Sequence, residues 1–196
     1  FYQPVIVSAL SVLFVFLISR KIAGNAGGFF AAMMMAINGA FLGRTLFGHA
    51  DTDTWVVFFA LLITWIFSEA MESKNIIKTV VLSVICGFFT GLFTYAWSGW
   101  WFIFDFVLIT IAVTILYLFI INFQGLRNIQ NLSIFKSSFG NMLVLGLVYF
   151  FSSAFFAVAI SGWRAFVTSF LGPLGFSSIK TPVSANLWPN VLTTVA

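Results

Sequence analysis

The sequence predicts an all-α fold, a polytopic bundle of helices that cross a membrane. Of the 196 residues, 61% are hydrophobic and 7% are charged, whereas a soluble domain averages roughly 25% charged residues. The apolar residues form continuous runs, without the alternation that is typical of membrane β-barrel strands. Both observations indicate an integral membrane protein with helical spans.

Six apolar runs approach or reach the length of a membrane span, which is roughly 17–25 residues. They are Pro4–Ser19, Ala26–Leu42, Trp55–Ala70, Ile76–Ala96, Trp100–Ile121 and Asn141–Ile160. Residues 1–160 are therefore predicted to form the transmembrane region. Residues 161–196 contain three of the four prolines, and we expect a long irregular external loop there. The chain starts and stops beside apolar runs, so we expect a fragment of a longer protein.

The basic residues predict which connections face the cytoplasm. The odd-numbered connections hold six Lys or Arg, whereas the even-numbered ones hold Arg44, Arg164 and Lys180. Because cytoplasmic loops carry an excess of Lys and Arg, the odd connections are expected inside. The loop before Trp55, the Trp97–Gly99 turn and the tail then face outside. The formal net charge of +4 is spread among the loops and predicts no nucleic-acid surface.

One polar cluster, residues 43–53, lies tightly between two apolar runs and is predicted to be an external catalytic loop. Asp51 and Asp53 supply carboxylate oxygens, which suit hard ions such as Mg²⁺ or Mn²⁺. Arg44 supplies a planar fork of donors that suits phosphate. The residues alone leave another interpretation open, because Asp is a favoured helix N-cap and the next span needs one.

Several other residues each have a structural and a functional interpretation. His49 is either a hydrogen-bonded loop residue or a ligand. Trp97 and Trp100 belong either to an interfacial aromatic belt or to a wall for a lipid chain. Asp105, about one turn inside its span, is either a functional intramembrane acid or a residue shallow enough to reach the lipid headgroups. The single cysteine, Cys86, lies in an apolar run and is expected to serve packing.

Three segments of this chain resemble the catalytic subunit of oligosaccharyltransferase. They are Asn25–Ala32 with Arg44, Gly48 and Asp51–Asp53; Tyr95–Ile103; and Thr194–Ala196. The first is similar to the family's span and its acidic Asp-x-Asp-type motif, and the second to its next external turn. The third resembles the family's Thr-x-x-Glu motif, ending just before the Glu. All three fall on the same predicted side of the membrane. By overall similarity, the sequence resembles archaeal members of the family most.

The resemblance implies a polyprenyl-phosphate-dependent glycosyltransferase of the GT-C type. Such a protein transfers an oligosaccharide from a dolichol-type phosphate carrier to the asparagine of Asn-x-Ser/Thr. By resemblance, Asp51 would bind a divalent metal, Mn²⁺ or Mg²⁺, with Asp53 in or beside its shell. Arg44 would contact the phosphate, and Thr194 would belong to the acceptor-side loop. The implied partners are a lipid-linked oligosaccharide, an acceptor polypeptide and membrane lipid, with no nucleic acid.

The resemblance also sets expectations about location and completeness. We expect an archaeal-type cell membrane, with the active site on the external face. The family's first acidic loop motif, its loop glutamate and its sequon-recognising C-terminal domain have no counterpart here, so we expect the fragment to be inactive alone. Between the Asp motif and the long loop, the family layout implies six spans, whereas four are predicted here.

Two other functions compete with this interpretation. A transporter or channel with an external cation site at Asp51 and Asp53 would place polar groups near mid-membrane, and the predicted spans nearly lack them. Another polyprenyl-phosphate glycosyltransferase, such as a protein mannosyltransferase, would share the architecture, but the Thr194 motif argues against it.

Overall fold

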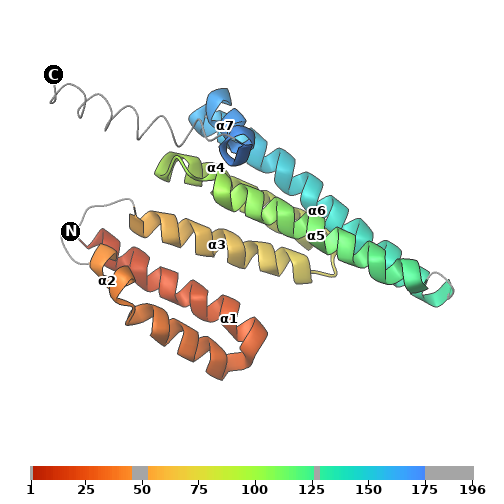
Figure 1. Ribbon diagram of the computed structural model, residues 1–196, viewed down its shortest axis with the longest axis horizontal. Helices are drawn as coiled ribbons and strands as arrows, with labels where there is room; N and C mark the ends of the chain where they lie inside the picture. Colours follow the sequence, from red (N-terminus) through yellow and green to blue (C-terminus); the bar gives the residue numbers. More distant parts are fainter. Residues whose placement is uncertain (1, 46–52, 126–128, 175–196) are drawn as a thin grey trace, which may run out of the picture.

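The protein is a bundle of α-helices, without strands in the part that is described. The computed structural model describes residues 2–45, 53–125 and 129–174 (Figure 1). Its helices are α1 (Gln3–Ala36), α2 (Gly39–Thr45), α3 (Asp53–Glu72), α4 (Ile76–Ala96), α5 (Trp101–Gly125), α6 (Ile129–Ser161) and α7 (Trp163–Leu174). The predicted fold class is confirmed.

Five of the described helices are long and apolar enough to cross a membrane, namely α1, α3, α4, α5 and the Ser138–Ser161 part of α6. The sequence predicted six spans, and the difference arises in α1. This helix has non-helical backbone at Ala23 and Gly24 and turns back on itself there (Figure 1). Gly24 has a φ of 68°, a conformation that glycine adopts without steric cost. The first two predicted spans are therefore two arms of one bent element.

The second predicted span, Ala26–Leu42, is not the uninterrupted helix that we expected. The helix ends at Ala36 and a new one, α2, begins at Gly39. Between them, the side-chain oxygen of Asn38 accepts a hydrogen bond from the Phe41 backbone N–H at 3.0 Å. Asn competes for local backbone groups in this way, which favours a helix start over a continuing helix.

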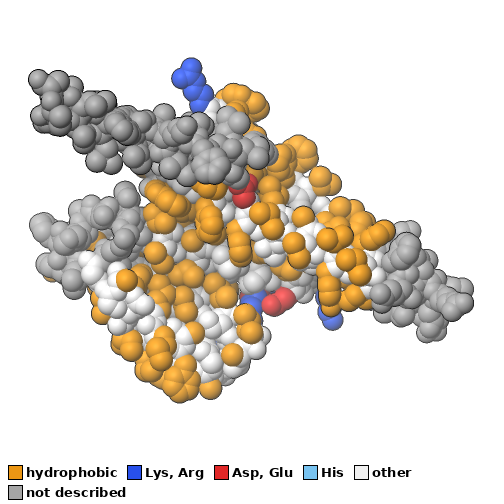
Figure 2. Space-filling model, in the orientation of Figure 1, with side chains coloured by type: hydrophobic (Ala, Val, Ile, Leu, Met, Phe, Trp, Pro, Cys, Tyr) orange, Lys and Arg blue, Asp and Glu red, His pale blue; other side chains and the backbone are white. Residues whose placement is uncertain are grey.

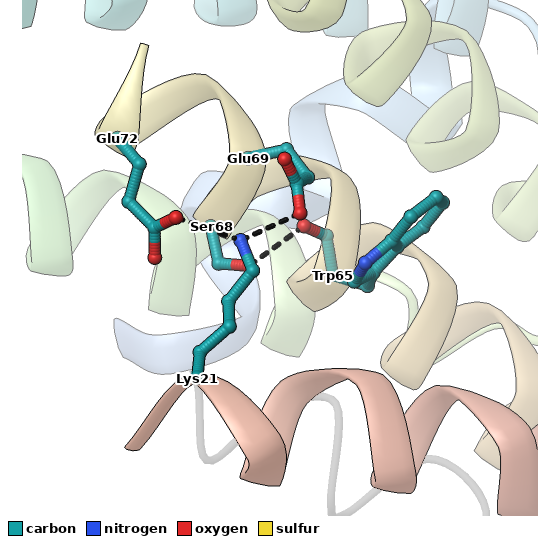
Figure 3. A network of polar contacts seen from close by, with 5 residues as sticks. All are labelled: Lys21, Trp65, Ser68, Glu69 and Glu72. Carbon is teal, nitrogen blue, oxygen red and sulfur yellow. Dashed lines mark hydrogen bonds and ion pairs between the residues drawn. The ribbon is translucent and has the colours of Figure 1, made fainter. Parts of the chain in front are cut away.

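Figure 3 shows how the bend of α1 is attached to the end of α3. The Lys21 ammonium lies 2.7 Å from a Glu69 carboxylate oxygen and 3.1 Å from one of Glu72. It also donates to the Ser68 hydroxyl at 3.2 Å. The first and third connections therefore lie at the same end of the bundle, as the charge pattern predicted.

The closest helix contact in the bundle is between α4 and α6, and glycines make it possible. A Cβ added to Gly91 would contact the Phe156 Cβ and lie 2.9 Å from the Phe156 carbonyl carbon. A Cβ on Gly87 would lie 2.8 Å from the Ser153 backbone nitrogen. Because lipid is as apolar as the helix surface, such close packing takes over the role that hydrophobic burial has in water.

Hydroxyl groups reinforce the same contact. The Thr90 and Tyr149 hydroxyls lie 3.2 Å apart, and the Thr94 and Ser161 hydroxyls lie 2.6 Å apart. Hydrogen bonds between membrane helices contribute about 0.6 kcal/mol each on average. Cys86 is buried on α4, where its thiol donates to the Ile63 carbonyl at 3.7 Å, so the predicted packing role is confirmed.

Two segments that we predicted to lie outside the spans, a connection and an irregular loop, contain helices. The predicted connection Asn122–Gly140 is helical apart from residues 126–128, which lie outside the described residues. It contains no proline, so nothing in it forces the helices to end at the membrane surface. The predicted loop 161–196 begins with α7, whose Phe166 is buried against Phe104 at a ring distance of 6.2 Å. Residues 175–196 lie outside the described part.

We predict that enlarging Gly91 will weaken the bundle. Gly91→Ala should destabilise the folded protein by about 1–3 kcal/mol, because a methyl group there overlaps α6. Thermal unfolding in detergent measures the loss. Gly140→Ala is the matched control, because a Cβ at Gly140 meets no atom within 4 Å. Equal melting temperatures for both variants would contradict the assigned contact.

A second prediction concerns the two ends of the bundle. In a Cys86→Ala background, Ser98→Cys and Lys74→Cys place single thiols on exposed positions at opposite ends of α4. A membrane-impermeant maleimide should label Ser98→Cys from outside intact cells and Lys74→Cys only after the membrane is opened. Labelling of both from one side would exclude α4 as a span.

Candidate functional site

The candidate site lies at the end of the bundle opposite the Lys21 ion pairs. The helices that flank the predicted catalytic loop, α2 and α3, contact each other there. Arg44 lies in the last turn of α2, and Asp53 is the first residue of α3. Their side chains are outside the described part of the structure, as are Asp51, His49 and Thr194 entirely. The structure thus places Arg44 and Asp53 on two helices that contact each other, and it leaves the predicted roles of the polar residues untested.

The first turn of α3 favours negative charge. The N-terminal N–H groups of a helix point outward, and the helix dipole stabilises carboxylates and phosphates beside them. Asp53 stands at this position, which suits both interpretations of it, a stabilising first-turn acid and a ligand-binding residue. The next residue, Thr54, is buried, and its hydroxyl has no hydrogen-bond partner among the described residues.

A chain of aromatic rings connects the start of α3 to the turn between α4 and α5. Trp55 stacks on Phe59 with ring centres 5.8 Å apart, and Phe59 stacks on Phe93 at 5.6 Å. Phe93 in turn contacts Trp97 at 5.9 Å. Such aromatic pairs have defined geometry, so they fix the distance between the acidic motif and the aromatic turn.

Glycine determines how Trp97 lies in that turn. The indole of Trp97 packs over Gly99 so closely that a Cβ there would lie 2.5 Å from the ring. Trp97 ends α4 in an extended conformation and is 39% exposed. Trp100, by contrast, is 1% exposed and packs on Phe104 at a ring distance of 5.6 Å. Of the two predicted lipid-wall tryptophans, Trp97 faces outward and Trp100 lies in the core.

An apolar pocket of about 390 Å³ opens beside Trp97. It is lined by Met35, Val56, Val57, Ala60, Leu61, Phe93, Trp97, Phe102 and Ile103. Val56 is three residues from Asp53, so the lining on α3 begins about one helical turn after the first residue of that helix. Sequence reasoning missed its walls on α1 and α3, because an apolar residue that lines a pocket looks the same in a sequence as one that faces lipid.

The metal prediction depends on residues that the structure does not describe. Among the described residues, no group of three or more His, Cys, Asp or Glu side chains could hold an ion. The donor set that remains is the carboxylate pair Asp51 and Asp53, whose chemistry suits a hard cation but falls short of a full coordination shell. The metal site therefore stays a prediction.

Comparison with known proteins identifies the family. The family model "Oligosaccharyl transferase STT3, N-terminal" matches residues 1–195. No curated protein and no solved structure matches this chain. The family match covers nearly all of the sequence, and the membrane-spanning helices fit it. The chain is therefore part of an integral, multi-pass membrane protein that belongs to the oligosaccharyl transferase STT3 family.

Proposed function

We propose that this chain forms the lipid-carrier side of an oligosaccharyltransferase active site. The enzyme would transfer an oligosaccharide from a dolichol-type phosphate carrier to the asparagine of Asn-x-Ser/Thr in an acceptor polypeptide. The observation that carries the proposal is the family match over residues 1–195, because STT3 proteins are glycosyltransferases. We further infer an archaeal-type cell membrane, with the site on the external face, where the sparsely charged connections are expected.

The arrangement of the bundle end supports this proposal. The α2–α3 junction and the Trp97–Gly99 turn resembled two family motifs, and they share one end of the bundle (Figure 1). Reaction at a membrane surface needs groups for the phosphate at that surface and an apolar path for the lipid behind it. The apolar pocket beside Trp97 suits part of an isoprenoid chain, and its lining on α3 begins at Val56, one helical turn after Asp53.

Each polar residue has a proposed role. Asp51, with Asp53 beside it, would hold Mn²⁺ or Mg²⁺, which neutralises negative charge on a leaving phosphate when it is bound. Arg44 would donate two parallel hydrogen bonds to phosphate oxygens. Asp53 would accept a hydrogen bond from the acceptor amide and orient its nitrogen toward the sugar. Thr194 would help to hold the acceptor peptide.

The described spans do not favour transport. Three buried hydroxyls on α4, those of Thr79, Ser83 and Thr90, donate to the carbonyl four residues earlier in the chain, at 3.1, 2.7 and 2.9 Å. Hydroxyls used in this way are satisfied by their own helix, and among the described residues only the Thr90 hydroxyl of the three also has a hydrogen bond to another helix, with Tyr149. An external cation site that serves a transport pathway therefore has no support in the described spans.

A third prediction tests the carboxylates in the protein at its full natural length. Asp51→Asn should reduce glycan transfer at least ~100-fold and weaken the Mn²⁺ dependence, because it removes the charge that a hard cation requires. Asp53→Asn should impair transfer but retain more metal affinity, because Asn preserves capping. Transfer rates are measured against Mn²⁺ concentration, with both variants at wild-type abundance. Normal transfer and metal affinity in Asp51→Asn would remove the metal site.

A fourth prediction tests Arg44. Arg44→Lys keeps the charge but loses the bidentate fork, so the KM for the lipid carrier should rise ~10-fold or more while the KM for the acceptor peptide stays the same. Arg164→Lys is the matched control, because Arg164 lies on α7 and is exposed. Unchanged carrier kinetics in Arg44→Ala would exclude Arg44 from the phosphate site.

A further inference from the structure

Asp105 is an acid inside the membrane part of the bundle that the proposed reaction does not use. It lies four residues into α5, and its Oδ2 atom is buried without a hydrogen-bond partner among the described residues. The described ion pairs belong to Lys21 at the opposite end of the bundle. A carboxyl group at such a depth is costly unless it is paired.

Asp105 faces a second pocket, between α5 and α7, of about 390 Å³. Its lining is otherwise apolar except for Ser169, and consists of Trp101, Phe102, Asp105, Phe106, Leu108, Ile109 and Ser169. The Ser169 hydroxyl already donates to the Phe166 carbonyl at 2.7 Å, so its proton is engaged. Figure 2 shows acidic atoms among hydrophobic side chains on this face of the bundle.

The depth of the pocket indicates what kind of group fills it. Its lining on α5 runs from Trp101 to Ile109, about 12 Å at 1.5 Å per residue, with Asp105 at the middle. An occupant therefore needs a hydrogen-bond donor that has apolar surface on both sides along the membrane normal. A lipid amine belongs to the headgroup layer, whereas Asp105 lies about one helical turn inside the span.

The exposed face of α5 continues the pocket toward the other end of the helix. Residues Phe102, Phe106, Ile109, Val113, Leu116 and Ile120 are each between 49% and 61% exposed. Their spacing alternates between four and three residues, the spacing of a seam that packs against another helix. A lipid-facing helix could also show such a seam, and the carboxyl group beside it is the feature that lipid does not explain.

We propose that this face of α5 docks another membrane-spanning helix, which places a Lys or Arg side chain against Asp105. Charge complementarity selects a basic residue, because the pocket holds a carboxylate and no Lys or Arg of the described residues lines it. The rings of Trp101 and Phe102 also favour a cation near their faces. Arg164, on α7, is exposed and is not among the lining residues. The proposal is independent of the proposed enzymatic function.

Site-specific photo-crosslinking in native membranes tests the proposal with the full-length protein. A benzophenone side chain replaces Phe106 in the pocket or, as the matched control, Tyr117, which is exposed on the same helix outside the pocket. The Phe106 probe should give one defined product, and mass spectrometry should identify the captured peptide as a membrane-spanning segment with a Lys or Arg. The Tyr117 probe should not capture the same basic residue.

The charge itself is tested by variants of Asp105 in the Phe106-probe protein. Asp105→Ala and Asp105→Asn should each lower the yield by roughly fivefold or more, whereas Asp105→Glu should retain it. Asp105→Lys combined with an acidic residue at the captured basic position should restore it. All yields are normalised to the amount of protein in the membrane, so loss of folding is not counted as loss of docking.

Five results would overturn the proposal. The first four are capture of lipid alone, a captured helix without a basic residue, a yield that does not depend on Asp105, and loss of the product in Arg164→Ala, which would identify Arg164 as the partner of Asp105. A product of twice the chain mass would also contradict it, since the described spans of a second copy offer no Lys or Arg at the depth of Asp105.

Discussion

The close contact between α4 and α6 is the constraint on which the rest of the bundle depends. The helix axes approach because Gly87 and Gly91 carry no side chain at the point of contact, and hydroxyl pairs such as Thr90 with Tyr149 then bridge the two helices. One side of this pair carries α3 and, through it, α1, and the other side carries α5 and α7. Because lipid gives membrane helices no hydrophobic reason to associate, the positions of all the outer helices follow from this steric fit.

The two ends of the bundle have different chemistry, and this difference indicates at which end the proposed reaction takes place. At one end, Lys21 neutralises the acidic end of α3, so the charges there hold the fold together. At the other end, the start of α3 carries an acid in the first turn of the helix, and stacked rings connect this turn to Trp97. An apolar pocket is lined by Val56, one helical turn after that acid. Phosphate chemistry at the surface and a lipid chain below it fit this end of the bundle.

Composition and periodicity were sufficient for the fold class, because a helix is the only element that such apolar runs can form in lipid. The buried Cys86 and the shared end of the first and third connections were also predictable, from an apolar run and from charge counting. The break at Asn38 and the helix α7 were not, since they depend on a local hydrogen bond and on the burial of Phe166. The pockets could not be foreseen, because lining them requires no distinctive residue type.

The family could be recognised from short motifs, and the family match confirms it. The roles of Asp51, Asp53 and Arg44 remain predictions.

The central claim is that a divalent cation binds at the end of the bundle where α3 begins. The most direct measurement is the dipolar EPR distance between bound Mn²⁺ and a nitroxide in the full-length protein, attached at Ser98→Cys or at Lys74→Cys. These positions stand at opposite ends of α4, a helix of 21 residues. Our account predicts a short distance to position 98 and one longer by roughly 20–30 Å to position 74. The reverse order, or no defined distance to either label, would contradict it.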